Sequence, residues 1–359
     1  MYSPFRHLGS VIHKARAIHL TFFLTRRCNA RCPFCFYLKA DEPSSTETDE
    51  LSLAEIQKIS ASFGNLLWLA FSGGEIFLRE DLVEISRTFY HNNRPAIMLF
   101  PTNGLLPEVI RDKTEQILKD SPKSIIAVKL SLDGLYQRHD ELRNTPGSFA
   151  RTMQTCQLLG ELAAKYPTFE LGINTVFCSE NQDNMEPLID FVRGLRNIKT
   201  HTISLVRGNL SDKRFKKVEH EKYQQAIEKL ESNLKDRTAE IYRFKGAKVK
   251  AAQDILQRRL IHRTEQEQRR LIPCYAGRLN IVLHENGDIF PCEILAKKLG
   301  NIRDAGYDLS KVLESASARK ILQSISNSEC FCTHECYFIT NILFNPRLYP
   351  ALLKEYMQL

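Results

Sequence analysis

The chain has 359 residues, of which 43% are hydrophobic, 26% charged and 9% aromatic, and its formal net charge is +8. This length allows two domains, and the composition is that of a globular protein rather than of a disordered or fibrous one. No stretch approaches the ~18 consecutive apolar residues that a membrane-spanning helix needs. The N-terminus shows no secretory signal, so we expect a cytoplasmic protein.

Six β-rich apolar runs recur in the first part of the chain and alternate with helical patterns. The predicted strands are Ile18–Leu24, Leu66–Phe71, Ala96–Phe100, Ile125–Leu132, Glu170–Phe177 and His201–Val206. The predicted helices lie near residues 53–63, 81–91, 106–119, 148–165 and 184–196. This alternation predicts an α/β fold with a parallel sheet, either open or closed into a barrel. In both arrangements ligands gather at the carboxyl ends of the strands.

Residues 207–270 are unusually basic and contain two predicted polar helices, Glu221–Asn233 and Ala251–Arg270. They hold 18 Lys and Arg against 10 Asp and Glu, a difference of +8 that equals the net charge of the whole chain. A nucleic-acid surface is one interpretation, but no aromatic residues interleave to stack bases. A solvated helical linker is the favoured interpretation.

Three cysteines follow the first predicted strand closely. Cys28, Cys32 and Cys35 have the spacing C-x3-C-x2-C. Three thiolates can hold three irons of a [4Fe–4S] cluster and leave the fourth iron open to a ligand. A structural zinc site needs four closed ligands, and no cysteine or histidine follows to supply the fourth. A redox pair of cysteines would leave Cys28 unexplained.

With Phe34 directly before Cys35, this triplet resembles the signature of the radical S-adenosylmethionine (SAM) enzymes. Gly73, Gly74 and Glu75 follow the second strand and resemble the family's GGE stretch, which receives the methionyl ammonium of SAM. Glycines let a backbone approach a ligand closely, and a carboxylate accepts hydrogen bonds from an ammonium. The resemblance implies further SAM contacts, although turn or capping chemistry explains each one equally well: Asn103, Ser131, Arg143 and Asn174.

The resemblance also implies a partial (β/α)6 barrel and a reaction. In this family, reductive cleavage of SAM at a [4Fe–4S] cluster generates a 5′-deoxyadenosyl radical, which abstracts hydrogen from the substrate. The electron comes from a donor such as flavodoxin or ferredoxin. The alternative is a metal-binding structural or nucleic-acid-binding protein without SAM chemistry.

A second group of five cysteines lies near the C-terminus. Cys274 and Cys292 flank a predicted hairpin, formed by Arg278–Leu283 and Ile289–Phe290, with the spacing C-x12-G-x4-C. This spacing resembles the opening of the SPASM and twitch extensions of radical SAM enzymes. The continuation, C-x-C-x3-C, departs from the full seven-cysteine SPASM pattern. We therefore expect a small domain of hairpin and helix with one auxiliary [4Fe–4S] cluster.

One cluster needs four of these five thiols. We expect Cys274, Cys292 and Cys336 as ligands. Cys332 is favoured over Cys330 as the fourth, because Cys332 and Cys336 match the closing spacing C-x3-C. His334 is expected near the cluster or on the surface rather than as a ligand. Glu293 follows Cys292, and the resemblance to sulfatase-maturing enzymes implies a role as a catalytic base. An Arg-paired or solvated carboxylate explains Glu293 equally well.

The predicted organisation is an N-terminal tail (1–14), a barrel (15–206), a basic helical linker (207–270), an auxiliary-cluster domain (271–345) and a C-terminal tail (346–359). The substrate is expected to be a small molecule, a sugar or a peptide. Because many peptide-modifying members carry an N-terminal recognition domain and 27 residues precede Cys28 here, we expect a small molecule or sugar ahead of a peptide.

Overall fold

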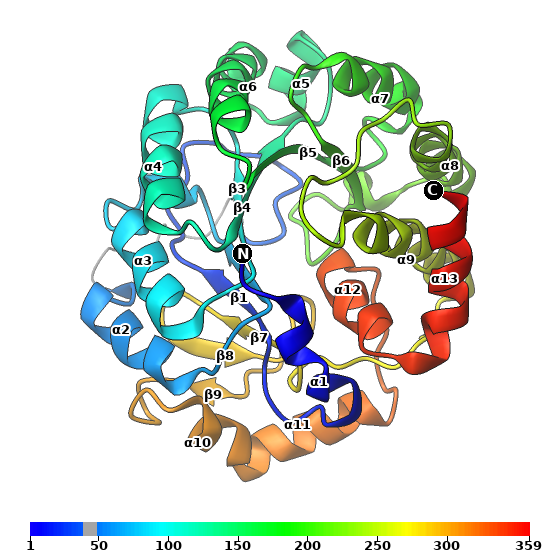
Figure 1. The fold of residues 1–359 in the computed structure, drawn as a ribbon. Coiled ribbons are helices and arrows are strands. Elements are labelled where there is room, and N and C mark those ends of the chain that lie inside the picture. Colours follow the sequence, from blue (N-terminus) through cyan, green and yellow to red (C-terminus); the bar gives the residue numbers. More distant parts are fainter. Residues whose placement is uncertain (39–48) are drawn as a thin grey trace.

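The computed structural model describes residues 1–38 and 49–359 (Figure 1). Six parallel strands form most of one sheet, in the order β6-β5-β4-β3-β2-β1. Each strand lies within two residues of its predicted bounds, which confirms the alternating α/β pattern. The strands are β1 (His19–Phe23), β2 (Trp68–Ser72), β3 (Ile97–Thr102), β4 (Ile125–Ser131), β5 (Phe169–Phe177) and β6 (Thr200–Leu205).

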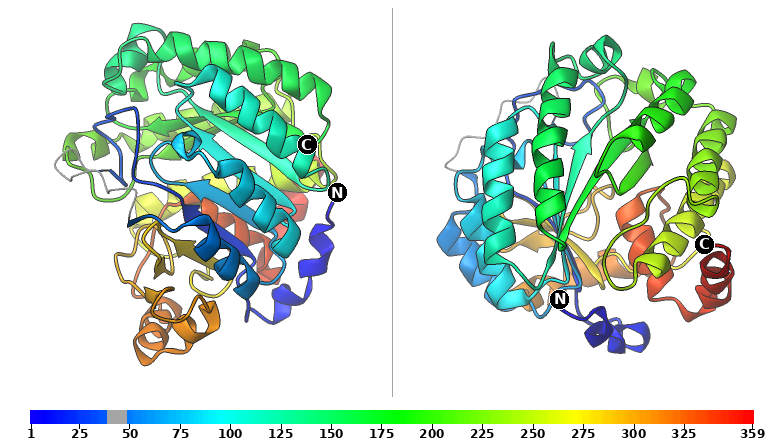
Figure 2. Two further views of the ribbon diagram at one scale, coloured as in Figure 1. Left: turned by 90° about the vertical axis from the view of Figure 1, so that its left-hand side faces the viewer. Right: turned by 45° about the horizontal axis from the view of Figure 1, so that its top comes forward.

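Helices between these strands cover the outer face of the curved sheet (Figures 1 and 2). Each has an apolar stripe at helical spacing that packs on the strands, and the bounds confirm the predicted helices. They are α2 (Leu53–Ser62), α3 (Leu82–Asn93), α4 (Pro107–Asp120), α6 (Ser148–Lys165) and α7 (Met185–Gly194). Shorter elements are α1 (Gly9–Ile12), α5 (Gln137–Leu142) and the 3-10 turns Pro4–His7, Ile76–Leu78, Gln182–Asn184, Lys213–Lys216 and Pro346–Leu348.

The C-terminal hairpin extends the same sheet beyond β1. Its first strand, β7 (Asn280–Leu283), pairs in parallel with β1, and β8 (Asp288–Phe290) pairs antiparallel with β7. A two-residue strand, β9 (Gly300–Asn301), completes a nine-stranded sheet. The hairpin itself confirms the sequence prediction. Its parallel pairing with β1 depends on a contact between distant parts of the chain and was not predicted.

The remaining side of the barrel is covered by helices from the last part of the chain. They are α8 (His220–Lys235), α9 (Ala247–Glu267), α12 (Glu335–Leu343) and α13 (Tyr349–Gln358), with α10 (Leu309–Glu314) and α11 (Ala316–Ser326) beside the hairpin (Figure 1). α9 contacts α8, α12 and α13. Its residues 250–253 are all buried, so α9 is a packed element and not a solvated linker helix. No helix in the described residues is long and apolar enough to cross a membrane.

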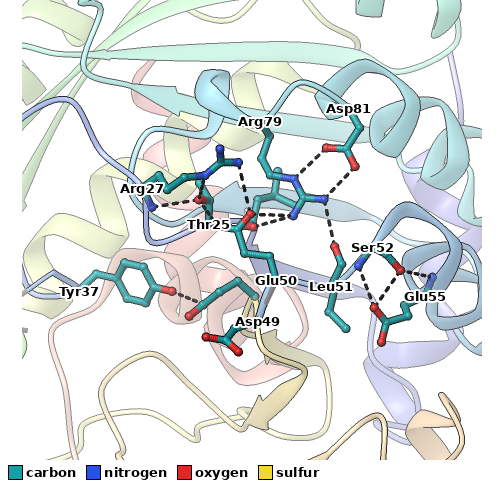
Figure 3. Close-up of polar contacts among 12 residues, drawn as sticks. Thr25, Arg27, Tyr37, Asp49, Glu50, Leu51, Ser52, Glu55, Arg79 and Asp81 are labelled. Carbon is teal, nitrogen blue, oxygen red and sulfur yellow. Dashed lines mark hydrogen bonds and ion pairs between the residues drawn. The ribbon is translucent and has the colours of Figure 1, made fainter. Parts of the chain in front are cut away.

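A buried charged network holds the segment that follows β1 (Figure 3). The Glu50 carboxylate accepts hydrogen bonds from the Thr25 hydroxyl, from Arg27 Nη2 at 3.4 Å and from Arg79 Nη1 at 3.3 Å. Arg79 Nε also donates to Asp81 at 2.8 Å. Glu50 is 8% exposed and Arg79 is 5% exposed. The network therefore ties the segment leading to Cys28 to the loops after β2.

Replacing Glu50 with Gln should destabilise the protein. The amide keeps the size of the side chain but leaves the buried guanidinium of Arg79 without one of its charged partners, at a cost of about 3–5 kcal/mol. Glu141→Gln is the matched control, because Glu141 forms an exposed pair with Arg138 that contributes about 0–1 kcal/mol. Urea unfolding measures both losses. Equal losses in the two variants would contradict a stabilising role of the network.

Candidate metal and cofactor sites

The cysteine triplet lies in the loop at the carboxyl end of β1. Cys28, Cys32 and Cys35 are partly buried and form no disulfide. The loop turns tightly, because the Cys35 amide donates to the Cys32 carbonyl at 3.1 Å. Burial raises the pKa of Cys28 and takes the pKa of Cys32 to about 11. Without a cation these groups are therefore thiols, and a bound metal would displace their protons.

Two donors from other parts of the chain, one after β3 and one at the end of α5, reach the sulfur atoms of this loop. Asn103, at the end of β3, places Nδ2 3.9 Å from Cys28 Sγ, and Arg143 places Nη1 3.8 Å from Cys32 Sγ. Arg143 is held by Asp133, whose Oδ2 accepts from Arg143 Nε at 2.7 Å. Burial disfavours the guanidinium charge, but Asp133 outweighs it and raises the pKa of Arg143. The structure thus brings Asn103 and Arg143 to the triplet.

Gly73 and Gly74 pack directly against the chain that leads into the triplet. A side chain at Gly74 would place its Cβ 2.1 Å from the Arg27 carbonyl oxygen, and at Gly73 2.5 Å from that of Thr25. The Gly74 amide donates to the Thr25 carbonyl at 2.7 Å, and the Glu75 amide donates to the Arg27 carbonyl at 2.8 Å. Glycine is therefore required here by contact with the cysteine loop, in addition to any contact with a ligand.

Glu75 is buried and already hydrogen-bonded within the chain. Its carboxylate accepts from the amides of Phe77 and Asn103, at 3.2 and 2.8 Å, and from the Thr102 hydroxyl at 2.9 Å. Burial raises the pKa of Glu75 to about 7 against the effect of these bonds. A carboxylate has about four acceptor positions, so Glu75 can accept one further donor.

The other predicted contacts lie at the same edge of the sheet. Ser131 and Asn174 are direct partners in the register of β4 and β5. Asn174 Oδ1 accepts from the Ser204 hydroxyl at 3.2 Å. Phe34 is 6% exposed, and its ring packs on Phe215 with a centroid distance of 5.6 Å. Phe34 therefore anchors the cysteine loop through its contact with Phe215.

These residues suit a cluster that needs three thiolates. One loop supplies three cysteine sulfurs, and polar hydrogens of Asn103 and Arg143 face two of them. Donors of this kind stabilise charge on cluster sulfur atoms. A [4Fe–4S] cluster held by these three thiolates alone would keep one iron open to a further ligand.

Four of the C-terminal cysteines line one cavity of about 100 Å³, together with Arg270, Phe331 and apolar side chains. These cysteines are Cys274, Cys292, Cys330 and Cys332. Burial takes the pKa of both Cys292 and Cys332 to about 12. Arg270 Nη2 lies 3.0 Å from Cys330 Sγ. The hairpin therefore brings Cys274 and Cys292 to one end, as the spacing indicated.

Cys336 does not line this cavity and lies instead beside Glu293 and His334. Oε2 of Glu293 is 2.8 Å from His334 Nε2 and 3.4 Å from Arg207 Nη2. His334 is 1% exposed, so it is a buried residue and not a surface one. Arg207 was not singled out from the sequence, where it is one of many basic residues after β6.

This environment disfavours the predicted role of Glu293 as a base. Burial alone would raise its pKa, but His334 and Arg207 outweigh burial and lower the pKa of Glu293 below its ordinary value. The same pairing raises the pKa of His334. A carboxylate held in two ion pairs accepts a proton less readily than a free one. The Arg-paired alternative describes the geometry of Glu293.

Two family models match the chain. That of the Radical SAM superfamily matches residues 22–192, and that of SPASM, an iron–sulfur cluster-binding domain, matches residues 274–337. The chain is 27% identical over 319 residues to the subtilosin biosynthesis protein AlbA of Bacillus subtilis, covering 86% of this chain and 62% of AlbA. It is 26% identical to an AdoMet-dependent heme synthase of Methanosarcina barkeri over 79% of both chains. The chain thus spans less than two thirds of AlbA.

Solved structures share the fold. One of anSMEcpe with bound AdoMet has a TM-score of 0.61 at 16% identity and covers 95% of this chain and 96% of that chain. One of Streptococcus suis SuiB bound to its precursor peptide SuiA has a TM-score of 0.58 at 16% identity, over 89% of this chain and 70% of SuiB. The predicted enzyme class is therefore confirmed over the structural or nucleic-acid-binding alternative. The chain contains a radical SAM domain, over residues 22–192, and a C-terminal SPASM iron–sulfur domain, over residues 274–337.

Proposed function

We propose that Cys28, Cys32 and Cys35 ligate the radical SAM cluster and that SAM binds beside it, over Gly73–Glu75. The main support is that both segments are hydrogen-bonded together at the carboxyl ends of β1 and β2. Further residues at this edge would contact SAM: Asn103, Ser131, Arg143 and Asn174.

When bound, the cluster supplies the electron that cleaves SAM to methionine and a 5′-deoxyadenosyl radical, which abstracts hydrogen from the substrate. The side chains around it bind and orient. Glu75 offers its remaining acceptor position to the ammonium of SAM. Arg143, held by Asp133, provides positive charge next to Cys32. Electron donation by a flavodoxin or ferredoxin is part of this proposal.

We further propose one auxiliary [4Fe–4S] cluster, ligated by Cys274, Cys292, Cys330 and Cys332. These four line a single cavity, and four thiolates satisfy one such cluster. This set differs from the sequence prediction, which favoured Cys336 over Cys330. The reason is local: Cys336 is the second residue of α12, and its neighbours are Glu293 and His334.

For the substrate, we propose a peptide. The similarity to AlbA, a bacteriocin biosynthesis protein, extends over 86% of this chain. SuiB, which shares this fold, has been solved with a bound precursor peptide. A heme precursor is the second candidate, because the similarity to the heme synthase covers 79% of the chain. The sequence alone favoured a small molecule or sugar ahead of a peptide. A heme precursor is itself a small molecule, so only the peptide proposal departs from that expectation.

Cys28→Ala should abolish cleavage of SAM, because the two cysteines that remain are too few to hold a cluster that needs three thiolate ligands. The measurement is 5′-deoxyadenosine formed by the reconstituted enzyme with dithionite under anaerobic conditions. Cys156→Ala is the control, since Cys156 is a buried thiol on α6, far along the chain from either cysteine group. Undiminished product from Cys28→Ala would refute the assignment of the triplet.

Gly74→Ala should weaken SAM binding at least ~10-fold, which corresponds to about 1.4 kcal/mol. The added Cβ would lie 2.1 Å from the Arg27 carbonyl oxygen and would displace either the cysteine loop or the GGE stretch. Gly64→Ala is the matched control, because a Cβ there meets nothing within 4 Å. Equilibrium dialysis of SAM against the reconstituted proteins compares them, and equal affinities would contradict the proposed contact.

Iron analysis tests the auxiliary cluster. The reconstituted enzyme should contain about eight irons per chain, and Cys292→Ala about four, because only the auxiliary cluster loses a ligand. The variant should keep the electron paramagnetic resonance signal of the SAM-responsive cluster. About four irons in the unaltered enzyme would mean that the C-terminal cysteines hold no cluster.

A further inference from the structure

The four-cysteine cavity leaves Cys336 without a cluster to ligate. It does not leave Cys336 without polar neighbours. Ligand atoms of Glu293, His334 and Cys336 all lie within 4.8 Å of one another. These three residues, the Cys336 triad, come from the segment after β8 and from the start of α12.

The triad has the donor set and the spacing of a zinc site. Zn²⁺ binds cysteine sulfur, histidine nitrogen and carboxylate oxygen at about 2.0–2.3 Å, which places neighbouring ligand atoms about 3.2–3.6 Å apart. Glu293 Oε2 and His334 Nε2 are 2.8 Å apart, so a slight separation would admit the ion. The side chains of His334 and Glu293 are 1% and 3% exposed, so their conformations are constrained by packing.

A carboxylate lies behind the histidine, as in most protein zinc sites. The second ring nitrogen of His334, Nδ1, is 3.6 Å from Glu335 Oε2. Nδ1 of His334 and Oε1 of Glu335 are both buried without a hydrogen-bond partner. Binding of a metal at Nε2 would orient the ring so that Nδ1–H donates to the Glu335 carboxylate, and this would satisfy the buried Nδ1.

Arg207 is a cation next to the triad. Its Nη2 is 3.4 Å from Glu293, and its Nη1 is 3.5 Å from Glu335. A divalent ion with one thiolate and one carboxylate is neutral, so Arg207 would then be balanced by Glu335. The charges at the site therefore sum to zero without a further anion.

We propose that Glu293, His334 and Cys336 bind one zinc ion, with the fourth coordination position open to water or to a polar group of the substrate. The proposal rests on the proposed function in one respect, namely that the auxiliary cluster takes the other four C-terminal cysteines. Zinc is favoured over ferrous iron at such a nitrogen and sulfur site by the general order of divalent affinities. Binding displaces the thiol proton of Cys336 and the proton between Glu293 and His334.

Metal analysis of the holoenzyme tests the site. The enzyme is reconstituted with iron and sulfide, given one equivalent of Zn²⁺, desalted over a weak chelator and analysed for both metals. We expect about one zinc per chain beside the iron of the clusters. Zinc-edge X-ray absorption of the same sample should show one sulfur and otherwise nitrogen or oxygen ligands.

Two variants separate this site from the auxiliary cluster. His334→Ala and Cys336→Ala should each lose the zinc and keep the full iron content, whereas Cys156→Ala should keep both metals. Absence of retained zinc in the unaltered enzyme, or zinc bound through several sulfurs, would overturn the proposal. Loss of about four irons from Cys336→Ala would assign Cys336 to the auxiliary cluster and would also overturn it. The iron and product measurements on Cys28→Ala test the radical SAM assignment separately.

Discussion

The parallel pairing of β1 with strands on both of its sides is the constraint on which both cysteine groups depend. Every residue of β1 is buried, and its register is fixed by β2 on one side and by β7 on the other. The cysteine triplet follows the carboxyl end of β1. Cys274 precedes β7 and Cys292 follows β8, so both lie at the open end of the hairpin, away from its turn. One short strand therefore determines how far apart the two groups lie.

An arginine paired with a carboxylate lies beside each cysteine group. Arg143 is fixed by Asp133 and faces Cys32. Arg207 is shared between Glu293 and Glu335, and its guanidinium lies 4.8 Å from the centre of the Phe36 ring, just after the triplet. Because Arg207 follows β6, it connects the last barrel strand with both the cysteine loop and the SPASM domain. Removing one partner from such a group would leave a charge without compensation. This energetic penalty favours the arrangement in which all the contacts are present.

Much of this arrangement can be predicted from the sequence, because it depends on residues that are close together along the chain. Strand and helix bounds follow from periodicity, and the triplet and the GGE stretch follow strands whose carboxyl ends must meet. The parallel pairing of β7 with β1 joins residues about 260 positions apart, and no local pattern encodes it. The burial of α9 was missed for the same reason. The charged residues of α9 predict a solvent-exposed helix, yet α8, α12 and α13 pack against part of it.

The division of the C-terminal cysteines is the clearest case where spacing was insufficient. The sequence favoured Cys336 as a cluster ligand because only the number of residues between the cysteines could be compared. That number does not say in which direction each side chain points. A helix begins at Glu335, so successive side chains point about 100° apart around its axis. Cys336 consequently lies beside Glu293 and His334, while Cys330 and Cys332, in the irregular segment before the helix, line one cavity with Cys274. The start of α12 thus separates a soft, four-sulfur environment from one with mixed sulfur, nitrogen and oxygen donors. These are the environments that iron–sulfur clusters and zinc respectively prefer.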